Sequence, residues 1–87
     1  SVPGRKAPEE QRRDEILRAA FAVAARERLG GVTARAVAAE AGISSGLVFF
    51  HFETKDALIA ALLDWLLVHT IVAAELPIDR RLAARRP

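Results

Sequence analysis

The sequence predicts an all-α fold in which a three-helix bundle is followed by a long fourth helix. Three observations point to this fold. Apolar residues recur at helical spacing within residues 9–29, as is typical of an amphipathic helix. Two short segments with good capping residues follow between residues 33 and 51. A run that is apolar on nearly every side then extends from residue 57 to residue 76.

Length and composition restrict the chain to one small domain without disulfide or metal staples. Its 87 residues contain no cysteine, which excludes disulfides and thiolate metal sites and fits a reducing compartment. The two histidines, His51 and His69, are not paired at the spacing of metal ligands. We therefore expect no metal and no cofactor. The N-terminus also shows no secretory signal.

The stretch from residue 33 to residue 55 organises the rest of the chain. Thr33 can cap a helix over residues 34–41, because its side-chain oxygen accepts from a free amide of the first turn. Gly42 ends this helix, since glycine adopts the left-handed conformation without a Cβ clash. Ser44 then caps a second helix over residues 45–50. Such a pair is a helix-turn-helix, which commonly places its second helix in the major groove of DNA.

The preceding helix is expected to support this motif. It begins near Pro8, and Leu29 with the pair Gly30-Gly31 ends it. Its apolar face consists of Ile16, Leu17, Ala20, Phe21 and Ala24. In the helix-turn-helix, the residues expected to point inward or fill the angle between the helices are Val37, Ala38, Ala41, Ile43, Val48 and Phe52.

The remaining residues of the second short helix are expected on the outer surface or its rim. They are Ser45, Gly46, Leu47, Phe49, Phe50 and His51. Monomers seldom expose contiguous apolar patches without a use, and a DNA groove would cover this one. Leu47 would press on a thymine methyl group, and Ser45 would bond a base edge. The alternative is that the aromatic residues build the core, which we expect for Phe52 and leave open for Phe50.

The last helix follows Thr54, a good N-cap residue. Lys55 stands at the helix entrance, where it and the free amides suit a phosphate. Residues 57–74 approach the length of a membrane span, but Asp64 and His69 interrupt them. We expect no membrane contact. One side of the helix would pack on the first helix, and the other side on a partner absent from this chain.

Positive charges flank the predicted reading helix and do not lie on it. Residues 1–35 hold eight bases against five acids, residues 36–79 hold Lys55 against six acids, and residues 80–87 add four arginines. This distribution suits phosphates on both sides of a helix that faces the bases, although ordinary solvated charges would look alike. We divide the chain into a flexible basic arm (1–8), a helix-turn-helix domain (9–54), a linker helix (55–76), and a basic tail or the start of a further domain (77–87).

These features together resemble the DNA-binding half of the tetracycline-repressor (TetR) family, from about Arg13 to Leu67. The shorter matching motifs are Ile16-Leu17-x-Ala19-Ala20, Gly31-Val32-Thr33 and Ala38-x-x-Ala41-Gly42-Ile43-Ser44. The most specific run is Ser45-Gly46-Leu47-Val48-Phe49-Phe50-His51-Phe52-x-Thr54-Lys55-Asp56-x-Leu58. This run is hard to match by accident. It combines a small residue, a hydrophobic pair, an aromatic, the pair His-Phe and a lysine that enters the next helix.

The resemblance implies a homeodomain-like helix-turn-helix that reads a double-stranded DNA operator. It further implies a prokaryotic, cytoplasmic, nucleoid-associated homodimer that represses transcription. A second domain, absent from this chain, would dimerise and bind a small-molecule effector. The positions that commonly touch DNA are those of Arg35, Ser44, Ser45, Gly46, Leu47, Phe49, His51 and Lys55.

Two residues depart from the family pattern. A threonine often stands at the position of Leu47, and a tyrosine often stands at the position of Phe49. Because Phe49 has no hydroxyl, we expect packing against the sugar-phosphate in place of a phosphate hydrogen bond. Leu47 exchanges a hydrogen bond for apolar contact, which favours a thymine methyl group.

We therefore expect a sequence-specific DNA-binding regulator and no enzyme. An enzyme needs a poised nucleophile or an acid–base pair. The candidate His–Asp pairs are His51 with Asp56 and His69 with Asp64. Neither pair has the usual spacing that would place both side chains on one helix face, and neither has a third residue to complete a catalytic group. The alternative is a helical module that self-associates through the last helix without reading DNA. Salt-dependent binding to duplex DNA distinguishes the two.

Overall fold

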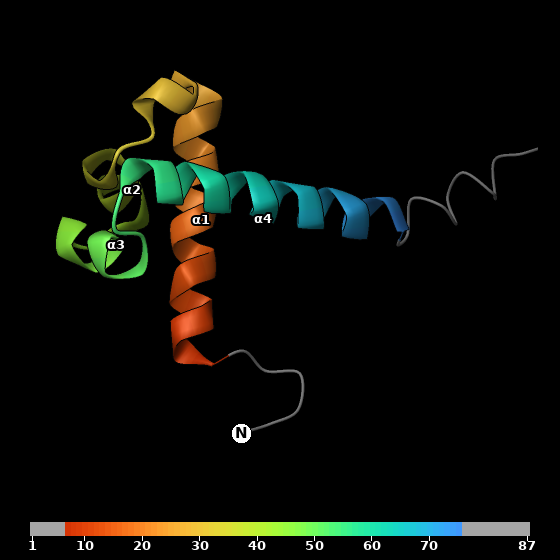
Figure 1. The fold of residues 1–87 in the computed structure, drawn as a ribbon, viewed down its shortest axis with the longest axis horizontal. Helices are drawn as coiled ribbons and strands as arrows, with labels where there is room; N and C mark the ends of the chain where they lie inside the picture. The colour runs from red at the N-terminus through yellow and green to blue at the C-terminus, as the bar shows by residue number, and fades with distance from the viewer. Residues whose placement is uncertain (1–6, 76–87) are drawn as a thin grey trace, which may run out of the picture.

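The computed structural model describes residues 7–75, and every regular element in this range is a helix (Figure 1). The elements are α1 (Pro8–Glu27), the short 3-10 helix η1 (Leu29–Gly31), α2 (Ala34–Ala41), α3 (Ser45–His51) and α4 (Lys55–Glu75). The predicted fold class, a three-helix bundle with a helix-turn-helix and a long fourth helix, is confirmed. Most of the predicted basic arm and all of the predicted tail lie outside the described residues.

The core is built from residues of all four α-helices. α1 packs against α2 and against α4, and α2 packs against α3. The largest fully buried side chains are Ile16, Leu17, Val23, Val32, Val37, Val48, Leu58 and Leu62. The inward positions predicted for Val37, Ala38, Val48 and Phe52 are confirmed, whereas Ala41 and Ile43 are half-buried and pack against the edge of this core.

One predicted core residue lies elsewhere. Phe21 is 46% exposed, because it lies about a third of a turn around α1 from the buried row of Ile16, Ala20 and Val23. Its ring instead meets the ring of Trp65 on α4, with the two centroids 6.3 Å apart. Val23 fills the core position that the sequence interpretation had overlooked.

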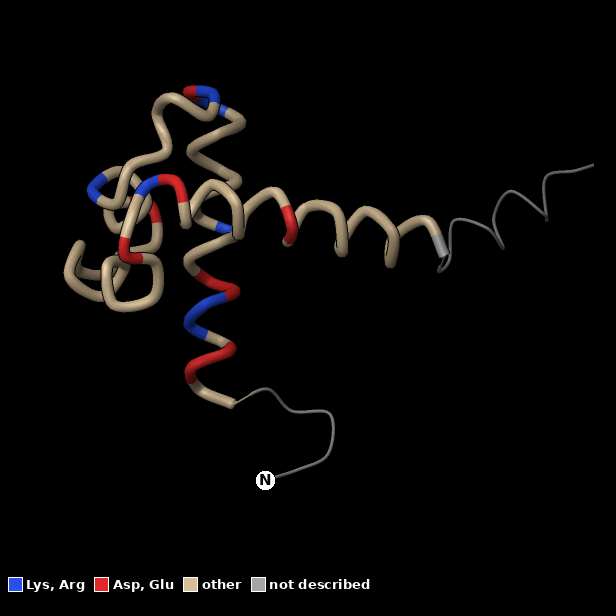
Figure 2. Tube along the Cα trace, in the orientation of Figure 1, with Lys and Arg blue, Asp and Glu red and all other residues tan. Residues whose placement is uncertain are grey.

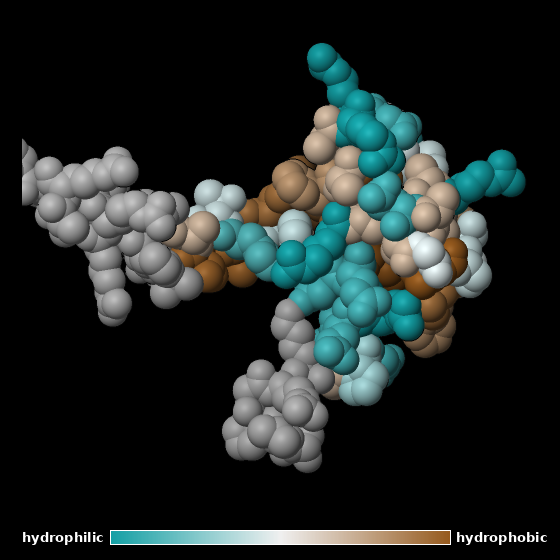
Figure 3. All heavy atoms as spheres, turned by 180° about the vertical axis from the view of Figure 1, so that it is seen from behind, coloured by the Kyte–Doolittle hydropathy of each residue, from teal (hydrophilic) through white to brown (hydrophobic). Residues whose placement is uncertain are grey.

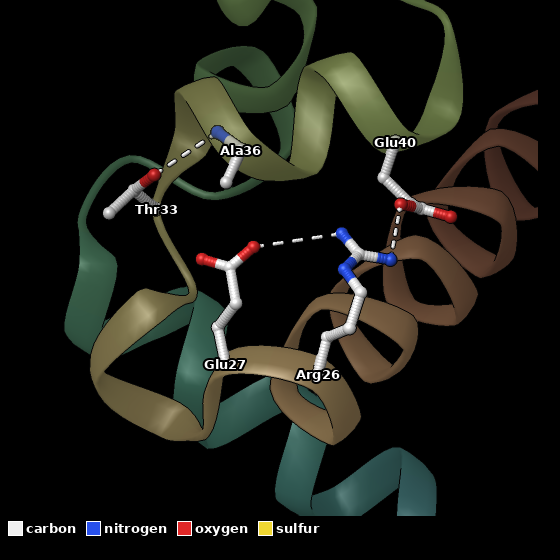
Figure 4. Close-up of polar contacts among 5 residues, drawn as sticks. All are labelled: Arg26, Glu27, Thr33, Ala36 and Glu40. Carbon is white, nitrogen blue, oxygen red and sulfur yellow. Dashed lines mark hydrogen bonds and ion pairs between the residues drawn. The ribbon is translucent and has the colours of Figure 1, made fainter.

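The predicted boundary residues of the helix-turn-helix perform their expected roles. Thr33 Oγ1 accepts a hydrogen bond from the Ala36 amide at 3.1 Å at the start of α2 (Figure 4). Gly42 ends α2 with a φ of 72°, which is the left-handed conformation. Ser44 Oγ accepts from the Leu47 amide at 3.1 Å, and Thr54 Oγ1 accepts from the Ala57 amide at 3.0 Å. Local sequence therefore determines the start of α2, α3 and α4.

The end of α1 differs from the prediction. The helix ends at Glu27, and Arg28, not a glycine, adopts a positive φ of 66° while its amide donates to the Ala24 carbonyl. The two glycines form part of η1. A Cβ at Gly31 would come within 2.6 Å of Glu27 Cβ, so this glycine lets η1 fold closely against the end of α1.

An ion pair links the end of α1 to α2. Arg26 lies between two carboxylates, at 3.0 Å from Glu40 on α2 and at 3.7 Å from Glu27 (Figure 4). These groups are largely exposed, so the pairs contribute at most about 1 kcal/mol. The orientation of α2 is therefore determined mainly by the buried side chains beneath it.

The cap of α2 leads to a first prediction. Replacing Thr33 by alanine should lower the free energy of unfolding by about 1 kcal/mol, because the Ala36 amide loses its acceptor. Replacing Thr33 by serine keeps the acceptor and serves as the control. Urea unfolding followed by circular dichroism measures both changes. Equal losses for the two variants would contradict the assigned cap.

α4 is covered on one side near its start and is open elsewhere. Leu58 and Leu62 are buried against the bundle, and Trp65 and Leu66 pack against its edge. The large apolar side chains that remain exposed on α4 are Leu63, Leu67, Val68, Ile71 and Val72. We call these five residues the α4 stripe; Figure 3 shows hydrophobic residues along this helix.

By length and composition, the stretch Lys55–Ala74 is the one helix in residues 7–75 that qualifies as able to cross a membrane. Its first turns are instead used in packing, because Leu58 and Leu62 are covered by the bundle. The α4 stripe spans residues 63–72, which is shorter than the roughly 20 residues that a spanning helix needs. The arrangement favours a helix that packs on protein.

Candidate nucleic-acid interface

The outer face of α3 combines exposure with an absence of Asp, Glu, Lys and Arg side chains. Figure 2 shows the α3 trace without any of these residues, while the helices around it carry them. Val48, three residues after the start of α3, and Phe52, directly after its end, point into the core. The rest of the helix is thereby left at the surface or on its rim, as the helical spacing predicts.

The first turn of α3 presents small groups. Ser44 and Gly46 are exposed and Ser45 is half-buried. A Cβ added at Gly46 would meet only the Ser44 hydroxyl oxygen, at an ordinary contact distance of 3.8 Å. The fold therefore does not require glycine at this position, in contrast to Gly42. What glycine provides here is room for a close approach to the backbone.

Two phenylalanines dominate the second turn. Phe49 is 51% exposed and Phe50 is 70% exposed, which makes Phe50 the most exposed large apolar side chain in the described chain. The Phe50 ring meets the His51 ring edge-on with centroids 5.2 Å apart. Leu47 and His51 are half-buried beside them. The surface is thus mostly apolar, with serine hydroxyls at one end and an imidazole at the other.

A hollow of about 240 Å³ connects α3 with the starts of α2 and α4. Its lining residues are Thr33, Ala34, Phe49, Phe52, Thr54, Lys55 and Leu58. It brings Phe49 and Lys55, two of the sequence-predicted site residues, to the same depression. Phe49 therefore faces the side of α3 that is shared with α2 and α4.

Lys55 is anchored to a segment far away in the sequence. Its Nζ donates a hydrogen bond of 2.9 Å to the Gly30 carbonyl oxygen in η1. An ammonium group has three donors, and among residues 7–75 Lys55 uses one of them. The contact holds the side chain near the start of α4 and at the rim of the hollow. Lys55 is thereby partly oriented before any ligand arrives.

Arg35 provides a second positive charge and directly follows Ala34, which lines the hollow. It lies in the first turn of α2, is exposed, and has no ion pair or hydrogen bond with any residue in the range 7–75. Other nearby bases are engaged. Arg13 lies over the ring of Phe52 at 5.3 Å, and Arg26 is paired with Glu40.

Comparison with known families decides the identity of this helix-turn-helix. Residues 16–62 match the family described as "Bacterial regulatory proteins, tetR family". The match begins inside α1, contains all of α2 and α3, and ends in α4, so it covers 47 of the 87 residues. The chain belongs to the TetR family. No curated protein and no solved structure matched the chain.

Membership of the TetR family makes this chain a DNA-binding regulator of transcription with a helix-turn-helix. Among the eight site residues predicted from the sequence, Ser44, Ser45, Gly46, Leu47, Phe49 and His51 lie on α3 or at its cap. Arg35 is on α2 and Lys55 begins α4. The TetR fold thus gathers all eight onto three neighbouring helices.

The sequence interpretation left Phe50 out of this set. Its exposure follows from helix geometry, because position 50 lies two residues, about 200° around the helix, from the buried Val48. The same geometry separates Phe50 from the buried Phe52. The exposure of Phe50 could therefore have been predicted from the residue spacing alone. The hydrogen bond from Lys55 to the Gly30 carbonyl could not be predicted in this way, since the two residues are 25 positions apart in the sequence.

Proposed function

We propose that this TetR-family chain is the DNA-reading part of a homodimeric repressor that inserts α3 into the major groove of a double-stranded operator. The observation that supports this proposal is the exposed, largely apolar outer face of α3, flanked by Arg35 and Lys55. The core already takes up Val48 and Phe52, and the rings of Phe49 and Phe50 are left exposed. A groove of DNA is a surface that would cover them.

The proposed contacts fall into two groups. Arg35 and Lys55 would bind phosphates on either side of the groove, because such contacts position a protein without reading sequence. The ammonium donors that Lys55 leaves unused among residues 7–75 suit this role, while Phe49 would pack on the sugar-phosphate beside the hollow. The residues proposed to meet base edges or lie within the groove are Ser44, Ser45, Gly46, Leu47 and His51.

Salt dependence tests the phosphate contacts. Binding to duplex DNA should weaken steeply as salt rises, since each neutralised phosphate releases condensed counterions. Arg35→Ala and Lys55→Ala should each weaken binding to all sequences alike and reduce the slope of log K against log salt by about 1. Fluorescence anisotropy with labelled duplexes at several salt concentrations measures this. Salt-independent binding, or none, would contradict the proposal.

A matched control is available in Arg18, which lies over the Trp65 ring at 5.6 Å and belongs to the α1–α4 joint. Arg18→Ala removes the same charge from the chain and should leave the slope unchanged. If it reduced the slope as much as Arg35→Ala, total charge and not the proposed site would control binding.

Replacing the groove residues should change sequence preference. We expect Ser45→Ala and Leu47→Ala to shift which duplexes are selected from a random pool, whereas Lys55→Ala lowers affinity without a shift. Sequencing of the bound duplexes measures the preference. Half-sites in a dimer should recur at about one helical turn or a multiple of it. Identical selections from Ser45→Ala and Lys55→Ala would contradict the division of roles.

The α4 stripe favours a second candidate, a module that self-associates through α4. Its five apolar side chains are about half exposed, which suits burial against protein. Within the TetR proposal, residues 9–54 are the DNA-binding domain and α4 is the linker to a dimerisation and effector-binding domain outside this chain. Sedimentation with and without operator DNA distinguishes the candidates. Self-association without any DNA binding would favour the second. The regulator would act in the cytoplasm, at the operator.

A further inference from the structure

We infer that the α3 face recognises the C5-methyl groups of pyrimidines, so that the preferred half-site carries thymines where α3 meets the groove floor. The inference rests on the proposed function, because it needs α3 in the major groove. It adds which chemical group of the DNA is read.

The polar groups available on α3 are few. Bidentate recognition of guanine takes Arg or Lys, and that of adenine takes Asn or Gln. Residues 44–52 contain none of these four types. Ser44 Oγ already accepts from the Leu47 amide, and Ser45 is half-buried. Two serine hydroxyls and the His51 imidazole are therefore the whole set of side-chain hydrogen-bonding groups on this face.

The apolar groups are more extensive. Phe50 is 70% exposed, and Leu47 is half-buried on the same helix. Phe49 lines the hollow beside Lys55, whereas Phe50 does not. Phe49 therefore lies on the flank that faces the sugar-phosphate, which leaves Phe50 and Leu47 for the floor of the groove.

Among the groups that base pairs present in the major groove, the thymine C5-methyl is the apolar one. An apolar surface that enters the groove gains most where such methyl groups lie, because each buried carbon removes apolar area from water. Burial of one methyl-sized group corresponds to about a four-fold gain in affinity. Thymine and 5-methylcytosine share this group.

Replacing thymine by uracil tests the inference, because uracil keeps the charge and the hydrogen-bonding edge of thymine and lacks the methyl group. The probes are alternating duplexes of deoxyadenosine with thymidine or with deoxyuridine, equal in length. We expect the full chain to bind the thymine duplex at least about four-fold more tightly, for one contacted methyl group. Equal affinity for the two duplexes would overturn the inference and leave the proposed function intact.

Variants assign the preference to the side chains. Phe50→Ala and Leu47→Ala should each reduce the thymine-to-uracil affinity ratio, and the double variant should bring it close to one. Arg35→Ala should weaken binding to both duplexes and leave the ratio unchanged. A ratio that persists in the double variant would assign the preference to DNA shape and overturn the inference. Circular dichroism confirms that each variant is folded. Absence of salt-dependent binding to either duplex would overturn the proposed function itself.

Discussion

Replacing Leu62 by alanine is expected to lower the free energy of unfolding by about 2–5 kcal/mol, whereas the same change at Leu63 should cost less than about 0.5 kcal/mol. Leu62 is fully buried where α4 crosses the bundle, and its neighbour Leu63 is 50% exposed. The two variants remove identical atoms from adjacent positions of one helix. The difference between them therefore isolates burial from helix propensity.

Urea unfolding of both variants, followed by circular dichroism at 222 nm, measures the effect. Total stabilities of small domains are about 5–15 kcal/mol, so loss of the Leu62 side chain removes a large share. Measurement at several protein concentrations separates folding from association through the α4 stripe. Equal losses at the two positions would contradict the packing of α4 on the bundle.

Replacing Phe50 by glutamate is expected to weaken DNA binding by about 100-fold, because like charges opposed at an interface cost several kcal/mol. The side chain is 70% exposed, so the melting temperature should hardly change. The effect therefore separates binding from folding. Fluorescence anisotropy at a single low salt concentration measures the loss.

The control for this variant is Thr70→Glu, which adds the same charge at an exposed position in the last turns of α4. Its affinity should remain within about three-fold of the original, which is the size of a weak, screened surface effect. If Phe50→Glu and Thr70→Glu weakened binding equally, net charge would explain the loss and α3 would have no special role.

The helix boundaries that could be predicted from the sequence are those set by interactions within a few residues. Thr33, Ser44 and Thr54 cap helices through hydrogen bonds that span three positions, so each can be recognised within a few residues. Gly42 requires a positive φ, which again is a property of one residue. The bounds of α2 accordingly match the prediction, and α3 extends only one residue beyond it.

The features that were missed depend on packing between distant segments. The close approach of Gly31 to Glu27 explains why glycine stands at position 31 in η1, and it exists only in the folded chain. The neighbour that Phe21 meets at the edge of the core, Trp65, is supplied by α4, 44 positions later in the sequence. Lys55 reaches the Gly30 carbonyl across a 25-residue separation. The predicted DNA contacts of the eight site residues stay predictions until binding is measured.

The aromatic contact between Phe21 and Trp65 has a practical consequence. Trp65 is the single tryptophan of the chain, and its ring lies against the His69 ring at a tilt of 33°, with centroids 4.1 Å apart. Its Nε1–H is buried without a hydrogen-bond partner among residues 7–75. Ultraviolet emission excited at the indole therefore originates entirely at the joint between α1 and α4. The chain carries its own optical probe there, and tilting of α4 against α1 will change the emission without any added label.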